Sequence, residues 1–334
     1  MTPLDAIILG LVEGITEYLP VSSTGHLIIT SSLLGLDRDA ATKSAVDAFN
    51  IVIQGGAILA VIGLYRSRVR SMIMGLLGRD VIGRRLFLNL VVAFLPAAVF
   101  GVLLDDLIEA FLFKPWPVII ALALGGILLI GMKGWQDRVF ASAENETEVK
   151  GGRRFTEIED LTWRQALVVG LLQCVAMIPG TSRSMMTIVG GMFVGLRPKQ
   201  AAEFSFLLGL PTLGGACVYK SLKSGEEIAS LGTLPIVLGI AVATVSAAFA
   251  VKWLVGYLAK HGLAMFGWYR IALAAVLAGL WLGGIVQFGP DQPADAEDLA
   301  LGNVIRDAID RFQDAVAGWD FHTKVADGQN RVSH

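Results

Sequence analysis

The sequence predicts an all-α, polytopic integral membrane protein, and three observations support this fold class. The 334-residue chain is 54% hydrophobic and 17% charged, with a mean hydropathy of +0.64. Soluble domains average about 45–50% apolar and about 25% charged residues. Several apolar segments reach the roughly 20 residues that a membrane-spanning helix needs, and two more are interrupted by charges, proline or glycine. These observations argue against a soluble or disordered chain.

Six segments combine sufficient length with high apolar content, and we expect each to cross the bilayer as one helix. They lie near residues 47–65, 86–104, 116–133, 200–219, 233–258 and 268–287.

The two interrupted segments have a different character. Residues 3–19 include Glu13 and Glu17, and residues 165–196 are broken at Pro179 and carry Arg183. Charges and irregular backbone are tolerated at membrane depth only where they are buried in protein or line a cavity. We therefore expect both segments to form re-entrant pairs of half-helices.

Lysine and arginine residues set the predicted orientation, because cytoplasmic segments are enriched in them. Residues 66–85 and 133–164 are rich in basic side chains, whereas residues 105–115 carry Lys114 alone. Both basic segments are therefore predicted to be cytoplasmic. Residues 290–334 hold nine acidic and four basic residues, and we expect this tail to be extracytoplasmic and partly an amphipathic helix. No dense basic face is present, so nucleic acid is not an expected partner.

Three full spans follow each interrupted segment, in opposite orientations, which predicts an inverted repeat. Residues 10–13 and 170–173 are similar in sequence, although aligning Pro20 with Pro179 requires a one-residue gap. The predicted organisation has a single membrane domain and a separate tail. Its parts are repeat one (about 1–133), a cytoplasmic linker (about 134–160), repeat two (about 160–288, within a domain of 1–289) and the tail (290–334). In such folds the functional site lies where the repeats meet.

The first interrupted segment carries two carboxylates, Glu13 and Glu17, which share one helical face. Paired carboxylate oxygens suit a hard divalent cation such as Mg²⁺ or Ca²⁺. The alternative is that both carboxylates accept hydrogen bonds from neighbouring hydroxyl groups. Ionisable groups within the membrane favour a functional interpretation.

The hydroxyl-rich segment that follows begins after Pro20. Ser22, Ser23 and Thr24 are residue types that start helices, and the free N–H groups of a helix start bind anions. His26 follows Ser22 and Ser23 within one helical turn, and a hydroxyl beside an imidazole can form an activated nucleophile. The alternative is a capping serine cluster next to a buried histidine.

The second motif, residues 179–184, also starts a half-helix and adds Arg183, whose planar guanidinium suits phosphate. The alternative is that Arg183 only neutralises Glu13 or Glu17. The two motifs together favour a diphosphate-binding site with a metal. Gln54 either lines this cavity or bonds to backbone.

Residues 13–26, 179–184 and 203–208 together resemble the undecaprenyl-diphosphatase family, also called bacitracin-resistance proteins, and the resemblance covers about residues 3–288. It implies a multi-pass enzyme of the cell inner membrane whose active site opens to the periplasmic face. Such an enzyme hydrolyses a polyprenyl diphosphate lipid with a divalent cation. It thereby recycles the carrier for peptidoglycan synthesis and confers bacitracin resistance.

The resemblance also implies residue roles. Glu13 and Glu17 would bind metal or orient water, with Glu17 also among the catalytic residues. Ser23 would attack, His26 would transfer protons and Arg183 would clamp phosphate. Further phosphate-binding residues would be Ser22, Thr24, Thr181, Ser182, Ser184 and Gln54.

Several alternatives stay open at this point. The nucleophile is Ser23, His26 or water. Met185 replaces a glycine that is usual in the family, and we expect activity to survive this change. A polyprenyl-phosphate transporter or flippase on the same scaffold is the alternative function, and a homodimer is compatible with the sequence.

Overall fold

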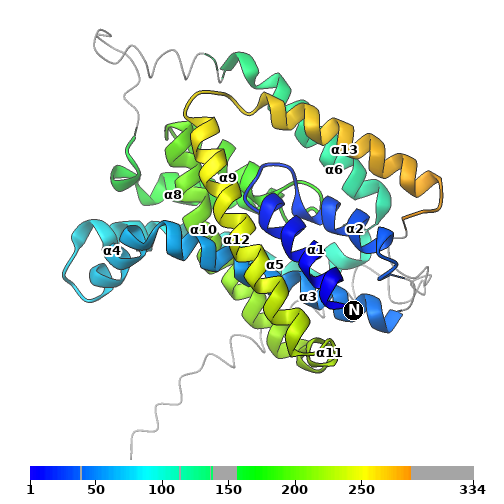
Figure 1. Cartoon of the computed structure of the whole chain (residues 1–334). Helices are drawn as coiled ribbons and strands as arrows, with labels where there is room; N and C mark the ends of the chain where they lie inside the picture. Colours follow the sequence, from blue (N-terminus) through cyan, green and yellow to red (C-terminus); the bar gives the residue numbers. More distant parts are fainter. Residues whose placement is uncertain (38–39, 113, 136, 138–155, 287–334) are drawn as a thin grey trace, which may run out of the picture.

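The computed structural model describes residues 1–37, 40–112, 114–135, 137 and 156–286, and this part of the chain is predominantly helical (Figure 1). It contains no β-strand, only an isolated bridge between Thr156 and Leu196. The helices, with one 3₁₀ turn (η1), are α1 (Pro3–Thr16), α2 (Ser23–Leu33), α3 (Ala40–Leu64), α4 (Arg66–Leu76), α5 (Val81–Leu112), α6 (Pro115–Gly131), η1 (Ile158–Asp160), α8 (Trp163–Val175), α9 (Arg183–Phe193), α10 (Pro198–Lys223), α11 (Gly225–Ser230), α12 (Thr233–Leu258) and α13 (Ala264–Leu282).

Six of the described helices are long and apolar enough to cross a membrane, which confirms the predicted fold class. The six spans are Ala41–Leu64, Val81–Leu104, Pro115–Trp135, Pro198–Lys223, Thr233–Leu258 and Ala264–Leu282. Both interrupted segments form a helix, a break and a second helix, as predicted: α1 with α2, and α8 with α9.

The connecting segments are more helical than expected. The basic segment 66–85 is largely α4 and the first turn of α5. Helix α5 continues to Leu112, through most of the segment expected to be an external loop. The acidic tail, its expected amphipathic helix and the middle of the linker lie outside the described residues.

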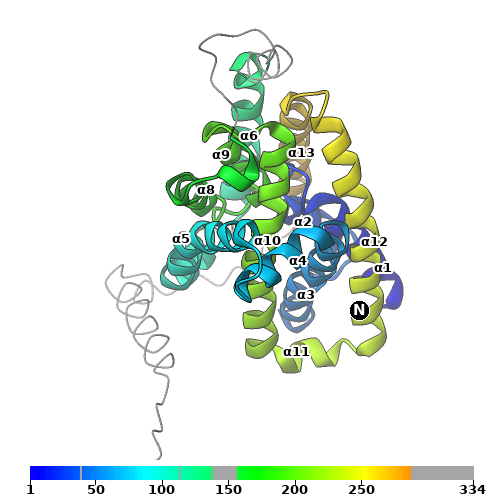
Figure 2. The same cartoon turned by 90° about the vertical axis from the view of Figure 1, so that its left-hand side faces the viewer.

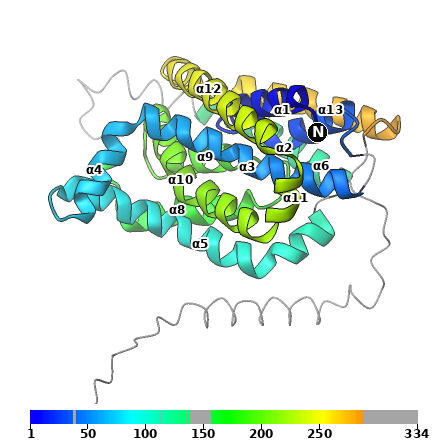
Figure 3. The ribbon, with the colours of Figure 1, turned by 60° about the horizontal axis from the view of Figure 1, so that its bottom comes forward.

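The helices of the two halves contact each other reciprocally. Helix α1 packs along α12, and α8 packs along α5; likewise α3 contacts α12 and α10 contacts α5 (Figures 1 and 2). Figure 3 shows α3 and α10 between α1 and α12 on one side and α5 and α8 on the other. Two related halves would make contacts of this kind, while their inverted orientation in a bilayer stays a prediction.

Glycines allow the broken helices to approach their partners closely. A Cβ added at Gly10 would meet the carbonyl oxygen of Gly239 in α12, and one added at Gly170 would meet that of Ala93 in α5. Small residues at helix contacts let backbones approach in membrane proteins. The interrupted segments are therefore held firmly against full-length spans.

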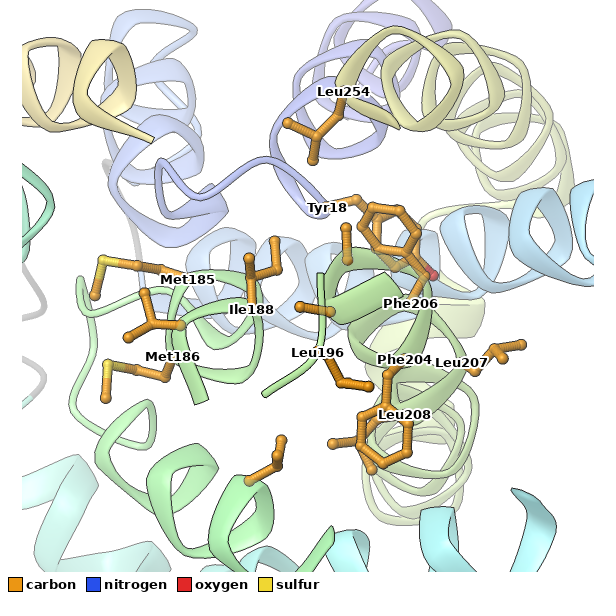
Figure 4. Close-up of a cluster of buried hydrophobic side chains, with 14 of the residues drawn as sticks. Tyr18, Met185, Met186, Ile188, Leu196, Phe204, Phe206, Leu207, Leu208 and Leu254 are labelled. Atoms are coloured by element: carbon orange, nitrogen blue, oxygen red, sulfur yellow. The ribbon is translucent and has the colours of Figure 1, made fainter. Parts of the chain in front are cut away.

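A buried apolar cluster lies beside the two breaks (Figure 4). Tyr18, in the first break, packs edge-to-face on Phe206 of α10 with 5.2 Å between ring centroids. Its hydroxyl donates to the Ala57 carbonyl at 3.1 Å. Met185 is buried in the same cluster, so its thioether fills the space that a glycine would leave open. This packing fixes the first break against both α3 and α10.

Candidate active site

The two helix breaks lie next to each other in the structure. The first follows α1 and ends at Ser22, and the second follows α8 and ends at Ser182. Across the gap, the Ser184 hydroxyl donates to the Leu19 carbonyl at 2.8 Å. Residues separated by most of the first repeat and the linker therefore form one site.

Ser22 and Ser182 have the same unusual backbone conformation. Among the described non-glycine residues they alone have positive φ, 70° and 77°, and each is the N-cap of its second half-helix. Such conformations cost on the order of 1–3 kcal/mol and concentrate at functional sites. The equivalence also corrects the gapped proline alignment. Counting back equally from the two serines reaches Glu13 and Gln173 without a gap.

An ion pair joins the two breaks. The Glu17 Oε1 atom lies 2.9 Å from a terminal nitrogen of Arg183, and the two side chains are only 6% and 13% exposed. Arg183 also donates to the Ser205 carbonyl at 3.0 Å, and its guanidinium lies 5.5 Å from the centre of the Tyr18 ring. The structure thus pairs Arg183 with a carboxylate of the first motif, while its role toward phosphate stays a prediction.

Ser23 donates its hydroxyl hydrogen to the other oxygen of Glu17, Oε2, at 2.8 Å. Glu17 therefore lies between the Ser23 hydroxyl group and the Arg183 guanidinium. The sequence spacing indicated His26 as the neighbour of Ser22 or Ser23, but the hydroxyl of Ser23 is paired with the carboxylate. A carboxylate so placed can accept the proton of an attacking serine.

Glu13 is completely buried, and neither of its carboxylate oxygens has a hydrogen-bond partner. Its counterpart Gln173 is 3% exposed, and its amide atoms also lack partners. Buried polar groups almost always have partners. Glu17 is the C-cap of the same helix, one turn further along. The two unpartnered oxygens of Glu13 are therefore suited to bind a cation together with Glu17.

These carboxylates are too few to enclose a cation by themselves, but they fit Mg²⁺, which keeps water and substrate ligands. Among the described residues no group of three or more His, Cys, Asp or Glu side chains forms a metal cluster. Mg²⁺, however, is usually held by one or two carboxylates together with substrate phosphates and water. Glu13 and Glu17 could supply such a pair.

His26 has both ring nitrogens engaged. Nδ1 lies 2.7 Å from the Ser22 carbonyl oxygen, and Nε2 lies 2.7 Å from the Tyr269 hydroxyl. A carbonyl can only accept, so Nδ1 carries the proton and Nε2 accepts from Tyr269 while the ring is neutral. Tyr269 was not found by sequence reasoning, because nothing in an apolar span near Trp268 indicates contact with the first motif.

The two half-helix starts differ in how they are capped. The Ser182 hydroxyl accepts from the Met185 amide at 3.3 Å and lies 3.1 Å from the Ser184 hydroxyl. No side chain caps the start of α2. Free N–H groups at a helix start attract anions, so the start of α2 is the more open anion site.

For three other predicted phosphate-binding residues, the structure gives a position but no contact that indicates a role. Thr181 is buried in the second break, Thr24 is half-buried at the start of α2, and Gln54 is half-buried on α3. Their roles stay predictions.

Arg270 is a second buried guanidinium at this site. It is 0% exposed, donates to the carbonyls of Gly180 at 2.8 Å and Ala121 at 3.1 Å, and makes longer bonds to Leu122 and Pro20. Within the described residues it makes no ion pair with a carboxylate. Arg270 thus ties both breaks to α6. An arginine inside an apolar span was the available signal, and the sequence prediction did not use it.

One cavity of the described structure lies away from the two breaks. Its volume is about 530 Å³, and its walls include Arg68, Glu159 and Glu203. Arg68 pairs with both of these carboxylates, at 2.8 Å from Glu203. No predicted site residue lines this cavity, so it does not compete with the breaks as the reaction centre.

Comparisons with known proteins identify the family of this chain. The family model described as bacitracin resistance protein BacA matches residues 6–276. An undecaprenyl-diphosphatase of Methylibium petroleiphilum is 43% identical, over 84% of this chain and 96% of that protein. Proteins with the same name from Sorangium cellulosum and Azotobacter vinelandii are 45% and 43% identical, over 83% and 86% of this chain and 85% and 97% of theirs. The chain therefore belongs to the bacitracin resistance protein BacA family.

Proposed function

We propose that this chain is an undecaprenyl-diphosphatase of the cell inner membrane. It hydrolyses undecaprenyl diphosphate to undecaprenyl phosphate and inorganic phosphate. The observation that carries the proposal is the chain of contacts Ser23–Glu17–Arg183, in which one carboxylate joins a hydroxyl at 2.8 Å and a guanidinium at 2.9 Å. The names of the similar proteins support the same reaction.

Ser23 is the best-placed nucleophile. Its oxygen attacks the terminal phosphorus, its proton passes to Glu17, and the bond from phosphorus to the bridging oxygen breaks. Undecaprenyl phosphate leaves with the electron pair of that bond. Water then attacks the phosphoserine: its oxygen bonds to phosphorus as its proton passes to His26, and the bond from phosphorus to the Ser23 oxygen breaks. Glu17 returns its proton to that oxygen, which restores the Ser23 hydroxyl and releases inorganic phosphate.

Charge at the transferring phosphoryl group is neutralised from two directions. Arg183 provides a planar cation from the second break, and the uncapped start of α2 provides backbone N–H groups. Such preorganised donors stabilise charge that develops in the transition state. Glu13 and Glu17 would hold a divalent cation, which supplies further neutralisation when bound.

The orientation follows from the basic segments. Residues 66–85 and 133–164 would face the cytoplasm, and the breaks would open toward the periplasm. There the enzyme would recycle the lipid carrier of peptidoglycan synthesis, which would confer bacitracin resistance. Every proposed site residue belongs to one chain, so we expect the monomer to be active whether or not a homodimer forms.

Phosphate release from detergent-solubilised undecaprenyl diphosphate tests the proposal. Glu17→Ala and Arg183→Ala should each reduce the rate by at least about 100-fold, the usual effect of removing a group that stabilises the transition state. Arg70→Ala, on the exposed face of α4, is the matched control and should retain the native rate.

Two results would overturn the proposal. One is full activity in both site variants. The other is movement of the lipid across proteoliposomes by native protein that releases no phosphate, which would instead support a flippase.

A further inference from the structure

A tyrosine on α13 contacts the one histidine of the proposed site. The Tyr269 hydroxyl lies 2.7 Å from His26 Nε2, and the two rings are nearly parallel, with an interplanar angle of 8°. The histidine belongs to the first half-helix pair and the tyrosine to the final span. This contact is therefore made only when α2 and α13 are packed together.

The surroundings leave one arrangement of protons on the neutral imidazole. Nδ1 must donate to the Ser22 carbonyl at 2.7 Å, because a carbonyl oxygen has no proton to offer. Nε2 is then the only basic nitrogen, and it faces Tyr269. The other ring nitrogen of a functional histidine commonly sets its tautomer in this way.

The position of Tyr269 is itself well determined. The next residue, Arg270, is fully buried and donates to backbone carbonyls of α6 and of the second break. The guanidinium thus anchors α13 one residue away from the tyrosine. Tyr269 itself is 47% exposed, so it is not enclosed by the packing that buries Arg270.

We propose that Tyr269 is a positioning residue that acts through His26, an inference that rests on the proposed phosphatase function. A phenol hydroxyl can both donate and accept hydrogen bonds. It donates to Nε2 while His26 is neutral. When Nε2 takes a proton from the water that attacks the phosphoserine, the hydroxyl hydrogen of Tyr269 turns away, and the phenol oxygen then accepts from Nε2–H. The tyrosine thus keeps the imidazole in one orientation and one tautomer through a proton transfer.

The Tyr269→Phe variant removes the hydroxyl and keeps the ring. We expect kcat for phosphate release to fall about tenfold, part of the 100-fold or more that a general acid–base group contributes, while KM changes less than about twofold. Tyr257→Phe is the matched control, because Tyr257 also stacks on a histidine, His261, with ring centroids 4.7 Å apart. This control should leave kcat and KM at native values.

Two further measurements separate positioning from a merely structural role. In a His26→Gln background, Tyr269→Phe should cause no further loss of kcat, because its partner is already gone. Nitrogen-15 NMR of histidine-labelled protein should show the His26 signals of a single Nδ1–H tautomer in native protein, and Tyr269→Phe should shift the Nε2 signal. The His26→Gln spectrum identifies these signals.

Several outcomes would overturn the inference. These are an unchanged kcat in Tyr269→Phe, a change confined to KM, an equal loss with and without His26, or an unshifted Nε2 signal. Failure of the proposed function has a different signature: native protein would release no phosphate, while the NMR comparison would still report on the contact between Tyr269 and His26.

Discussion

The ion pair between Glu17 and Arg183 should contribute to stability as well as to catalysis, and a double-mutant cycle can measure its contribution. The perturbations are Glu17→Gln and Arg183→Met, which remove each charge with little change in shape. Because the two side chains are only 6% and 13% exposed, solvent screens the pair weakly. Unit charges about 4 Å apart attract by about 4 kcal/mol at an effective dielectric constant of about 20.

Each single variant leaves the other charge buried without its partner, which typically costs about 3–5 kcal/mol. Arg183→Met should be the more damaging change, because it leaves Glu17 and the unpartnered Glu13 together in one buried region. Glu17→Gln should cost less, because an amide oxygen can still accept from Ser23 or Arg183. We expect the double variant to be more stable than the sum predicts by about 2–3 kcal/mol, near the upper end of measured pair energies.

The assay is equilibrium unfolding of the purified protein in detergent, with tryptophan fluorescence as the signal. The pair between Arg85 and Asp160 provides a matched control, because it is longer, at 3.8 Å, and its side chains are 59% and 74% exposed. Exposed pairs contribute little, so this second cycle should be nearly additive. Additive effects in the Glu17–Arg183 cycle, or equal coupling in the two cycles, would refute the reasoning.

Three further predictions test the packing, the charges and the metal site. Gly56→Ala should lower the free energy of unfolding by about 1–3 kcal/mol, because the added Cβ would meet the Ile240 carbonyl. Gly55→Ala places its Cβ in open space and should raise the free energy of unfolding by about 0.5–1 kcal/mol. Unfolding curves that reverse this order would contradict the helix contact. The Gly83 amide and the Ser71 hydroxyl donate to Asp80 and hold the pKa of its carboxyl below the usual range, so this stabilisation is complete at neutral pH and is lost as the pH falls through the lowered pKa. Melting temperatures at pH 7 and pH 3 should therefore differ less in Asp80→Asn than in native protein, and an unchanged difference would count against the assignment. Glu13→Gln should raise the Mg²⁺ concentration for half-maximal phosphate release at least about tenfold, since it removes one of the two proposed carboxylate ligands. The melting temperature in metal-free buffer should not fall. A native Mg²⁺ dependence would exclude Glu13 as a ligand.

The parts of the fold that depend on local sequence were predictable. Apolar length alone located the six spans, and Pro20 and Pro179 marked the two breaks because proline and glycine end helices. The helical extent of α4 and the long continuation of α5 were missed. Their polar residues were interpreted as loops, although helices that leave the apolar layer can carry charges without cost.

The sequence predicted most residues of the candidate site, but it predicted less well which of them contact one another. Helical spacing indicated that His26 would reach the hydroxyl of Ser22 or Ser23, but its ring contacts the Ser22 carbonyl instead. The Ser23 hydroxyl contacts Glu17, because the chain turns back between α1 and α2. The contact between Glu17 and Arg183 could be proposed only as one alternative. Tyr269 and Arg270 were missed because their partners lie far away in the sequence, and a single sequence carries no record of such proximity.

The difference between the two breaks explains why the chain has one site rather than two. Both breaks place a serine with positive φ at the start of a half-helix, so their backbones offer similar anion-binding geometry. The first break is preceded by Glu13, and the equivalent position before the second holds the neutral Gln173. The first contributes carboxylates and a hydroxyl group, and the second contributes the guanidinium of Arg183. Neither set alone could both deprotonate a serine and neutralise a phosphate, so the proposed mechanism requires that the two halves pack together.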